Sequence, residues 1–273
     1  MDKTSVGQLA IWRHPVKNEN GEAWARVLLV HGVCEQSWRH RNTIKCLTGQ
    51  GLEVVRFDLR GHGESGGERQ WIKHFHDYVD DVAAVQRWIM SSLPKRSLFL
   101  LGHSLGGAIA IYSAAEMGDA FRGLLLNAPA FELGAGVSRL KIVAGKIVNR
   151  VAPHVRVSNG LDLTALSRDP EVAKAVDVDP LCCRYNTVHQ AIEILNALAG
   201  ILAKCKEIKI PVLLTHGDKD RIIAVKGSQR ILEALASTDK TLDVFPGGFH
   251  ETHNDLCKDD YFKLIVSWMK TRA

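Results

Sequence analysis

Residues 97–110 read SLFLLGHSLGGAIA, and this stretch decides the fold class. Its first half is a short apolar run typical of a buried strand, and its second half is typical of a buried helix. The turn between them has the pattern Gly102-x-Ser104-x-Gly106, which exposes a serine at the carboxyl end of a sheet. In this strand–turn–helix context, the pattern predicts that Ser104 is a nucleophile.

The alternation of strand and helix continues on both sides of this turn. Apolar runs at 25–30, 53–58, 97–101, 123–127, 211–215 and 241–245 predict strands, and helical periodicity fills most of the intervals. Runs this apolar are typical of parallel strands that are covered on both faces. The sequence therefore predicts an α/β protein with a mostly parallel central sheet and helices on both faces.

Between residues 131 and 206 this alternation stops, and the sequence predicts helices with no convincing strand. We therefore expect a core of residues 1–130 and 207–273 with an inserted helical cap of residues 131–206. Six apolar residues of the cap share one helical face, flanked by cations: Leu140, Val143, Ala144, Ile147, Val148 and Val151. The face either packs on the core or belongs to a lid that meets a lipid surface.

Composition excludes several classes of protein. The chain has 273 residues, of which 46% are hydrophobic and 24% charged, which excludes a disordered or low-complexity protein. The net charge of +5 is spread along the chain, so we expect no nucleic-acid partner. There is no membrane-spanning stretch, signal-peptide pattern or CxxC motif among the six cysteines. We expect a cytoplasmic protein with reduced thiols, and the sequence indicates no oligomeric state.

A serine nucleophile requires a general base and an acid that orients the base. In this fold the acid precedes the histidine in the chain, and both follow strands. His250 follows the last predicted strand, so it is the predicted base. Asp218 and Asp220 both follow the preceding strand, and we favour Asp220 as the acid because it lies farther beyond the strand end.

Stabilising the tetrahedral intermediate requires two preorganised backbone donors, which form an oxyanion hole. One is expected to be the N–H of Leu105, the residue after the nucleophile. The other is expected from the loop after the strand 25–30, where Val33 is the candidate.

Several motifs then coincide in one order: HGVCEQSWR (31–39), DLRGHGES (58–65), GHSLGGAIA (102–110), HGDKDR (216–221) and GGFHETH (247–253). This set resembles the α/β-hydrolase superfamily. More closely, it is similar to monoacylglycerol lipases and the lysophospholipase-like bacterial relatives of serine-aminopeptidase-type hydrolases.

The resemblance implies that the enzyme hydrolyses a monoacylglycerol to fatty acid and glycerol, without a metal or cofactor. It implies that Glu35, Arg39 and His253 line a polar pocket for the glycerol hydroxyls. From the apolar stripe flanked by cations, we expect the cap to contact a membrane or lipid aggregate peripherally. Cys34 departs from the family, which typically has glycine there. A lysophospholipase or general carboxylesterase is the nearest alternative, and a non-enzymatic module on the same fold is the more distant one.

Overall fold

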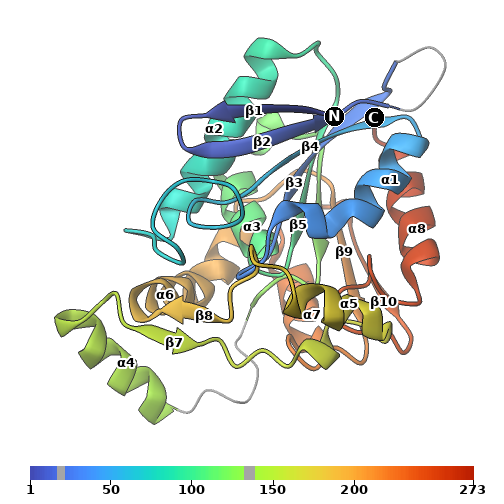
Figure 1. The fold of residues 1–273 in the computed structure, drawn as a ribbon. Coiled ribbons are helices and arrows are strands. Elements are labelled where there is room, and N and C mark those ends of the chain that lie inside the picture. The colour runs from blue at the N-terminus through green and yellow to red at the C-terminus, as the bar shows by residue number, and fades with distance from the viewer. Residues whose placement is uncertain (17–21, 132–138) are drawn as a thin grey trace.

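An eight-stranded sheet forms the centre of the protein (Figure 1). The computed structural model describes residues 1–16, 22–131 and 139–273, without the side chains of residues 139–141. The strand order is β1-β2-β4-β3-β5-β6-β9-β10. These strands are β1 (Asp2–Val6), β2 (Leu9–His14), β3 (Ala25–Val30), β4 (Leu52–Phe57), β5 (Leu98–His103), β6 (Gly123–Asn127), β9 (Val212–Gly217) and β10 (Lys240–Phe245).

The six strands from β4 to β10 run parallel to one another, which confirms the predicted α/β-hydrolase architecture. The antiparallel hairpin of β1 and β2 extends the sheet at one edge. This hairpin is absent from the strands predicted above. Its outer strand has the polar sequence DKTSV and is mostly exposed, so it lacks the apolar pattern that identifies a buried strand.

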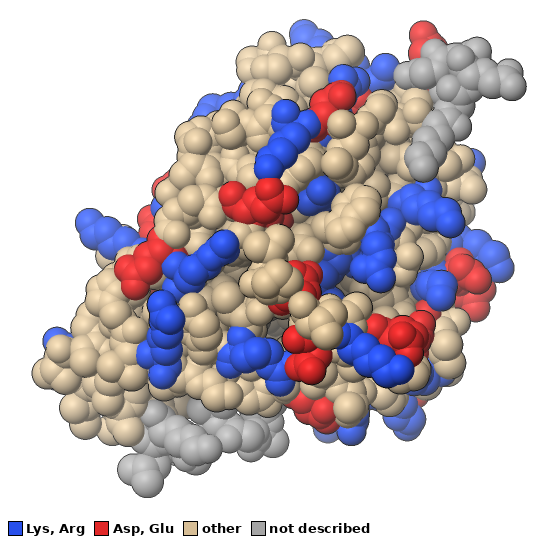
Figure 2. All heavy atoms as spheres, viewed as in Figure 1, with Lys and Arg blue, Asp and Glu red and all other residues tan. Residues whose placement is uncertain are grey.

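Helices cover both faces of the sheet, as predicted. Alternate residues along each parallel strand point to opposite faces, and each set joins a separate apolar core. One face is covered by α1 (Arg41–Gly49) and α8 (Lys258–Lys270). The other is covered by α2 (His76–Ser92), α3 (Leu105–Met117) and α7 (Val225–Ala234). Figure 2 shows cations and carboxylates interspersed on the visible face.

The segment between β6 and β9, which we call the cap, lies beside the carboxyl ends of the strands (Figure 1). Its elements are α4 (Arg139–Val151), β7 (Arg156–Ser158), η3 (Leu163–Ala165), α5 (Pro170–Asp177), β8 (Tyr185–Thr187) and α6 (Val188–Cys205). The expectation of a cap without strands is wrong, because β7 and β8 pair antiparallel. Both are only three residues long, which is too short for a period of two to be recognised.

The last cap helix also belongs to the core. The apolar face of α6 packs against α3, and Tyr112 donates a hydrogen bond of 2.7 Å to the carbonyl of Ala197. Among the residues that the structure describes, no helix combines the length and apolar composition that a bilayer crossing requires.

Candidate active site

Ser104 occupies the sharp turn between β5 and α3. Its backbone has φ 53° and ψ −121°, a conformation that residues with a side chain rarely adopt. A side chain at Gly102 would collide with the carbonyl oxygen of Gly106, and one at Gly106 would collide with the carbonyl oxygen of Val30. The two glycines therefore allow the neighbouring backbone segments to pack closely around the turn. The side chain of Ser104 lines a pocket.

The loops after β9 and β10 bring a carboxylate and an imidazole together. His250 Nδ1 lies 2.7 Å from Asp220 Oδ2, and both side chains are buried. The other candidate acid, Asp218, accepts a hydrogen bond of 2.6 Å from the N–H of Gly247. It shapes the turn, and the structure places Asp220 rather than Asp218 against His250.

Asp220 and His250 alter each other's titration. Burial alone would raise the pKa of Asp220, but the charge of His250 and hydrogen bonds from His216, His250 and a backbone N–H lower that pKa below its ordinary value. Burial alone would lower the pKa of His250, but the Asp220 carboxylate outweighs it and raises the pKa. The pair is therefore suited to a base whose protonated form is stabilised. In this conformation no hydrogen bond joins Ser104 to His250 within the described part of the chain.

The loop after β3 forms part of the pocket wall. Gly32, Val33 and Cys34 line the same pocket as Ser104, and a Cβ on Gly32 would lie 3.2 Å from Ser104 Cβ. Cys34 has φ 61°, so it adopts the left-handed conformation that a glycine would favour at this position. Burial raises the pKa of the Cys34 thiol to about 12, which keeps the thiol protonated near neutral pH.

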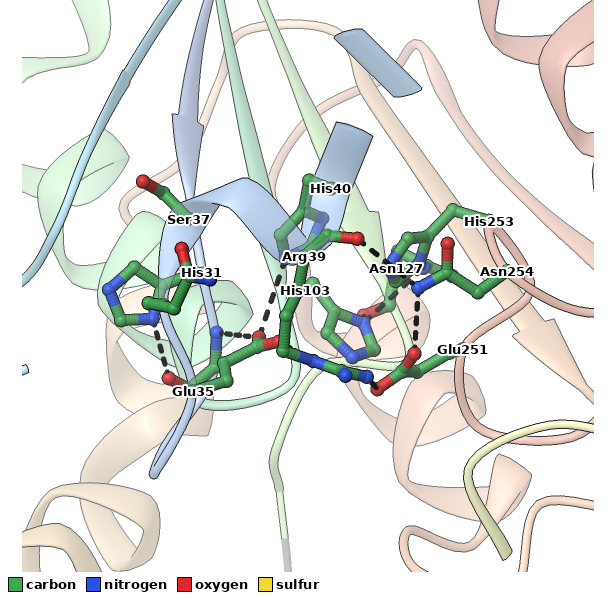
Figure 3. Close-up of polar contacts among 12 residues, drawn as sticks. His31, Glu35, Ser37, Arg39, His40, His103, Asn127, Glu251, His253 and Asn254 are labelled. Atoms are coloured by element: carbon green, nitrogen blue, oxygen red, sulfur yellow. Dashed lines mark hydrogen bonds and ion pairs between the residues drawn. The ribbon is translucent and has the colours of Figure 1, made fainter. Parts of the chain in front are cut away.

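A buried guanidinium lies between two of the carboxylates that line the pocket (Figure 3). Arg39 Nε donates to Glu35 Oε2 at 3.0 Å, and Arg39 Nη2 forms an ion pair with Glu251 Oε1. Glu35 Oε1 also accepts from the Gly32 N–H at 2.5 Å, so this carboxylate fixes the loop that carries Val33. Sequence reasoning missed Glu251, although its place next to the predicted base was a usable signal.

Glu35 and Arg39 both retain their charge in the buried cluster. Burial alone would raise the pKa of Glu35, but His40, Arg39 and His103 together lower it well below its ordinary value. Burial alone would lower the pKa of Arg39, but Glu251 and Glu35 raise it.

The structure does not bring His253 to this pocket. Its ring is 1% exposed, stacks on His40 at 4.4 Å between ring centroids, and meets His103 edge-on. Its Nδ1 lies 3.0 Å from Asn127 Nδ2, and burial lowers the pKa of the ring well below its ordinary value. His253 therefore lies behind His40, which in turn lies 3.4 Å from Glu35, and it supports this carboxylate indirectly.

The rest of the pocket wall is mainly apolar. Leu161, Leu163, Leu166 and Val176 from the cap and Ile222 from the core line it. The cavity volume is about 70 Å³. Within the described ranges, no group of three or more His, Cys, Asp and Glu residues is arranged to hold a metal ion.

Comparisons with known proteins identify the family of this chain. A family model described as serine aminopeptidase, S33, matches residues 21–257. A monoacylglycerol lipase of Mycolicibacterium smegmatis is 34% identical over 252 residues, which cover 88% of each chain. A human monoglyceride lipase is 34% identical over 257 residues, covering 93% of this chain and 84% of the human one.

Solved structures lead to the same family. The crystal structure of Paleococcus ferrophilus monoacylglycerol lipase superposes with a TM-score of 0.86 and 29% identity, over 96% of this chain and 99% of the other. With an α/β-hydrolase fold, a strained serine turn and these matches, the chain belongs to the serine aminopeptidase (S33) family of α/β-hydrolases.

Proposed function

We propose that this protein is a serine hydrolase that cleaves the fatty-acyl ester of monoacylglycerols to a fatty acid and glycerol. The observation that carries the proposal is the pocket beside Ser104, whose lining combines apolar side chains with the Glu35–Arg39–Glu251 cluster. A monoacylglycerol has the same two parts, since it joins an acyl chain to a head group with two free hydroxyls. The relatives named above as monoacylglycerol and monoglyceride lipases support this substrate.

In the proposed mechanism, Ser104 Oγ attacks the ester carbonyl while His250 Nε2 takes its proton. The N–H groups of Val33 and Leu105 hold the oxyanion, and Asp220 stabilises the imidazolium. His250 then protonates the leaving glycerol oxygen. In deacylation His250 takes a proton from the attacking water and then gives it to Ser104 Oγ, which frees the serine and leaves His250 neutral.

Arg39 and Glu35 are the proposed contacts for the glycerol hydroxyls. A guanidinium has five N–H groups, and Glu35 and Glu251 occupy only some of those of Arg39. The remaining donors can reach a hydroxyl oxygen, and carboxylate lone pairs can accept from a hydroxyl. We assign His253 an indirect role, because it contacts His40 rather than the pocket.

The family description raises the alternative of an aminopeptidase. Such an enzyme has to bind a cationic amino terminus, which favours a carboxylate that no other cation neutralises. The carboxylates on this pocket wall, Glu35 and Glu251, are both paired with Arg39. The relatives named above as monoacylglycerol and monoglyceride lipases support an uncharged polyol over an ammonium group.

A lysophospholipase is the second alternative. Its phosphate would meet two carboxylates and only one buried guanidinium, which disfavours binding. Arg184 is the feature that favours it, since this half-exposed cation lies on the pocket wall and is 4.0 Å from its carboxylate partner, Asp177.

We further propose that α4 contacts the lipid surface from which substrate enters. Val143, Ile147 and Val151 recur every four residues along this helix and are 54%, 61% and 81% exposed. Lys146 and Arg150 are exposed beside them, as expected of a helix that meets anionic lipid. Figure 2 is mainly uncharged at the lower left, where Figure 1 places α4. The predicted stripe also included Leu140, whose side chain lies outside the described residues.

A matched substrate panel tests the function. The purified protein is assayed with mono-, di- and triacylglycerols, a lysophospholipid and the methyl ester of one and the same fatty acid, with a short p-nitrophenyl ester as a soluble reference. We expect the highest kcat/KM for the monoacylglycerol. Equal values for the monoacylglycerol and the methyl ester would indicate a general carboxylesterase, and a preference for the lysophospholipid would indicate a phospholipid substrate.

A further inference from the structure

A second buried histidine contacts the candidate acid. His216 lies at the end of β9, four residues before Asp220, and is fully buried. Its Nε2 lies 3.1 Å from Asp220 Oδ2, the same oxygen that lies 2.7 Å from His250 Nδ1. Asp220 therefore bridges two imidazoles, of which only His250 lines the pocket.

The surroundings of His216 determine where its proton lies. Nε2 is 2.9 Å from the carbonyl oxygen of Ile223, which can only accept, so Nε2 carries a hydrogen. Nδ1 lies 2.8 Å from the hydroxyl of Ser228 on α7, which can donate to it. Ser228 occupies Nδ1, the second ring nitrogen, and His216 does not line the pocket. His216 is therefore not placed to take a proton from the substrate.

The Asp220 carboxylate is held at both oxygens. Oδ1 accepts the N–H groups of Ile222 at 2.7 Å and Ile223 at 2.9 Å, and Oδ2 faces His250 Nδ1 and His216 Nε2. The one hydrogen on His216 Nε2 lies between the Ile223 carbonyl at 2.9 Å and Asp220 Oδ2 at 3.1 Å, so the carboxylate shares it. Without His216, Oδ2 would keep only the contact to His250.

We propose that His216, held by Ser228, is a positioning residue that orients the Asp220 carboxylate toward His250. This inference rests on the proposed hydrolysis at Ser104, but it does not depend on which ester is the substrate. A lost hydrogen bond to a charged partner changes a rate by a factor of roughly 10 to 150. Because three donors to Asp220 remain, we expect an effect near the lower end, about 10-fold.

Three variants separate hydrogen bonding from packing. His216→Leu removes both ring nitrogens at similar volume, and His216→Gln keeps a donor and an acceptor. Ser228→Ala removes the donor to Nδ1 and allows the ring to shift its proton away from Nε2. Ser113→Ala, at a buried serine on α3, is the matched control.

The first readout is the rate at which a fluorophosphonate probe labels Ser104, which requires no choice of ester. We expect His216→Leu to label about 10-fold more slowly than the native protein, and Ser228→Ala severalfold more slowly. We expect His216→Gln to stay within about threefold and Ser113→Ala to label at the native rate. The second readout is the low-field proton resonance of the His250 Nδ1–H, which should shift in His216→Leu and remain in place in His216→Gln.

A folded His216→Leu variant with the native labelling rate and resonance would overturn the proposal. So would a His216→Gln variant as slow as His216→Leu, since only the shape of the ring would then matter. Should His216→Leu fail to fold, the comparison of Ser228→Ala with Ser113→Ala decides, and equal rates would overturn the proposal. A native protein that is not labelled at Ser104 would contradict the proposed function, and the resonance comparison alone would then decide the role of His216.

Discussion

Replacing Glu251 with Gln should change which head groups the pocket accepts. Glu35, Arg39 and Glu251 are all more than nine-tenths buried and together carry a net charge of −1. Glu251→Gln keeps the size of the side chain, can keep the contact between Oε2 and Asn254, and removes this net charge. An anionic head group should therefore bind better in the variant.

The size of the effect follows from Coulomb's law. At an effective dielectric constant of about 20, two unit charges about 6 Å apart repel by about 3 kcal/mol, a factor of roughly 100 in rate. Glu251 lines the pocket, so a phosphate on the glycerol would lie at about this distance. The expected result is a roughly 100-fold rise in the ratio of kcat/KM for a monoacylglycerol phosphate to that for the uncharged monoacylglycerol.

The assay measures both substrates with the native protein, Glu251→Gln and a control, Asp218→Asn. The control removes the same charge from an exposed turn outside the pocket, so its ratio should equal the native one. An unchanged ratio in Glu251→Gln would refute the argument, because the carboxylate would then not face the head group. An equal rise in the control would mean that the overall charge of the protein sets the ratio.

Three further predictions follow from the site and the cap. Asp220→Asn should lower kcat by about 10⁴ because the imidazole loses the acceptor that fixes its tautomer, while Asp218→Asn should cost less than about threefold; equal losses would reassign the acid. The pKa of His250 is raised because Asp220 outweighs the effect of burial, so kcat/KM should be half-maximal above pH 6.5 and fall tenfold per pH unit below that midpoint. A midpoint below pH 6.5 would contradict this assignment. The double variant Val143→Asp, Ile147→Asp should weaken vesicle binding at least tenfold and spare a short soluble ester, whereas equal loss on both would show that this face is not a lipid contact.

The serine turn could be predicted because its sequence pattern is local. Gly102 and Gly106 lie within two residues of Ser104. The collision that excludes a side chain at Gly102 lies within the strand–turn–helix unit, whereas the collision at Gly106 is with Val30 on the neighbouring strand β3. Asp220 and His250 could be placed for a related reason. The strands before them are parallel, so their carboxyl ends meet at one edge of the sheet.

The cluster of Glu35, Arg39 and Glu251 could be predicted only in part, because it depends on contacts between segments that are distant in the sequence. Glu35 and Arg39 lie four residues apart and pair within one turn, but Arg39 and Glu251 are 212 residues apart in the sequence. The resemblance to monoacylglycerol lipases implied that His253, three residues after His250, lines the pocket. In the structure its ring stacks on His40 instead and does not reach the pocket. Such stacking is a property of the assembled fold, and no local pattern reveals it.

The face of α4 was ambiguous for a different reason. A helical period of 3.6 residues predicts that one side is apolar, but not whether protein or lipid covers that side. The structure leaves Val143, Ile147 and Val151 exposed, while a Cβ added to Gly145 would lie 3.6 Å from Ile192 of α6. The apolar face therefore points away from the core, contrary to the interpretation that it packs there.

The most direct test of the central claim is the release of fatty acid from a monoacylglycerol by the native protein and by Ser104→Ala. Alanine fits the turn, so the variant should fold with the native thermal midpoint. We predict rapid release by the native protein and a loss on the order of 10⁶ in kcat for the variant, the scale expected when a serine nucleophile is removed. Release by a folded Ser104→Ala variant at more than a few per cent of the native rate, or no release by the native protein, would contradict the account.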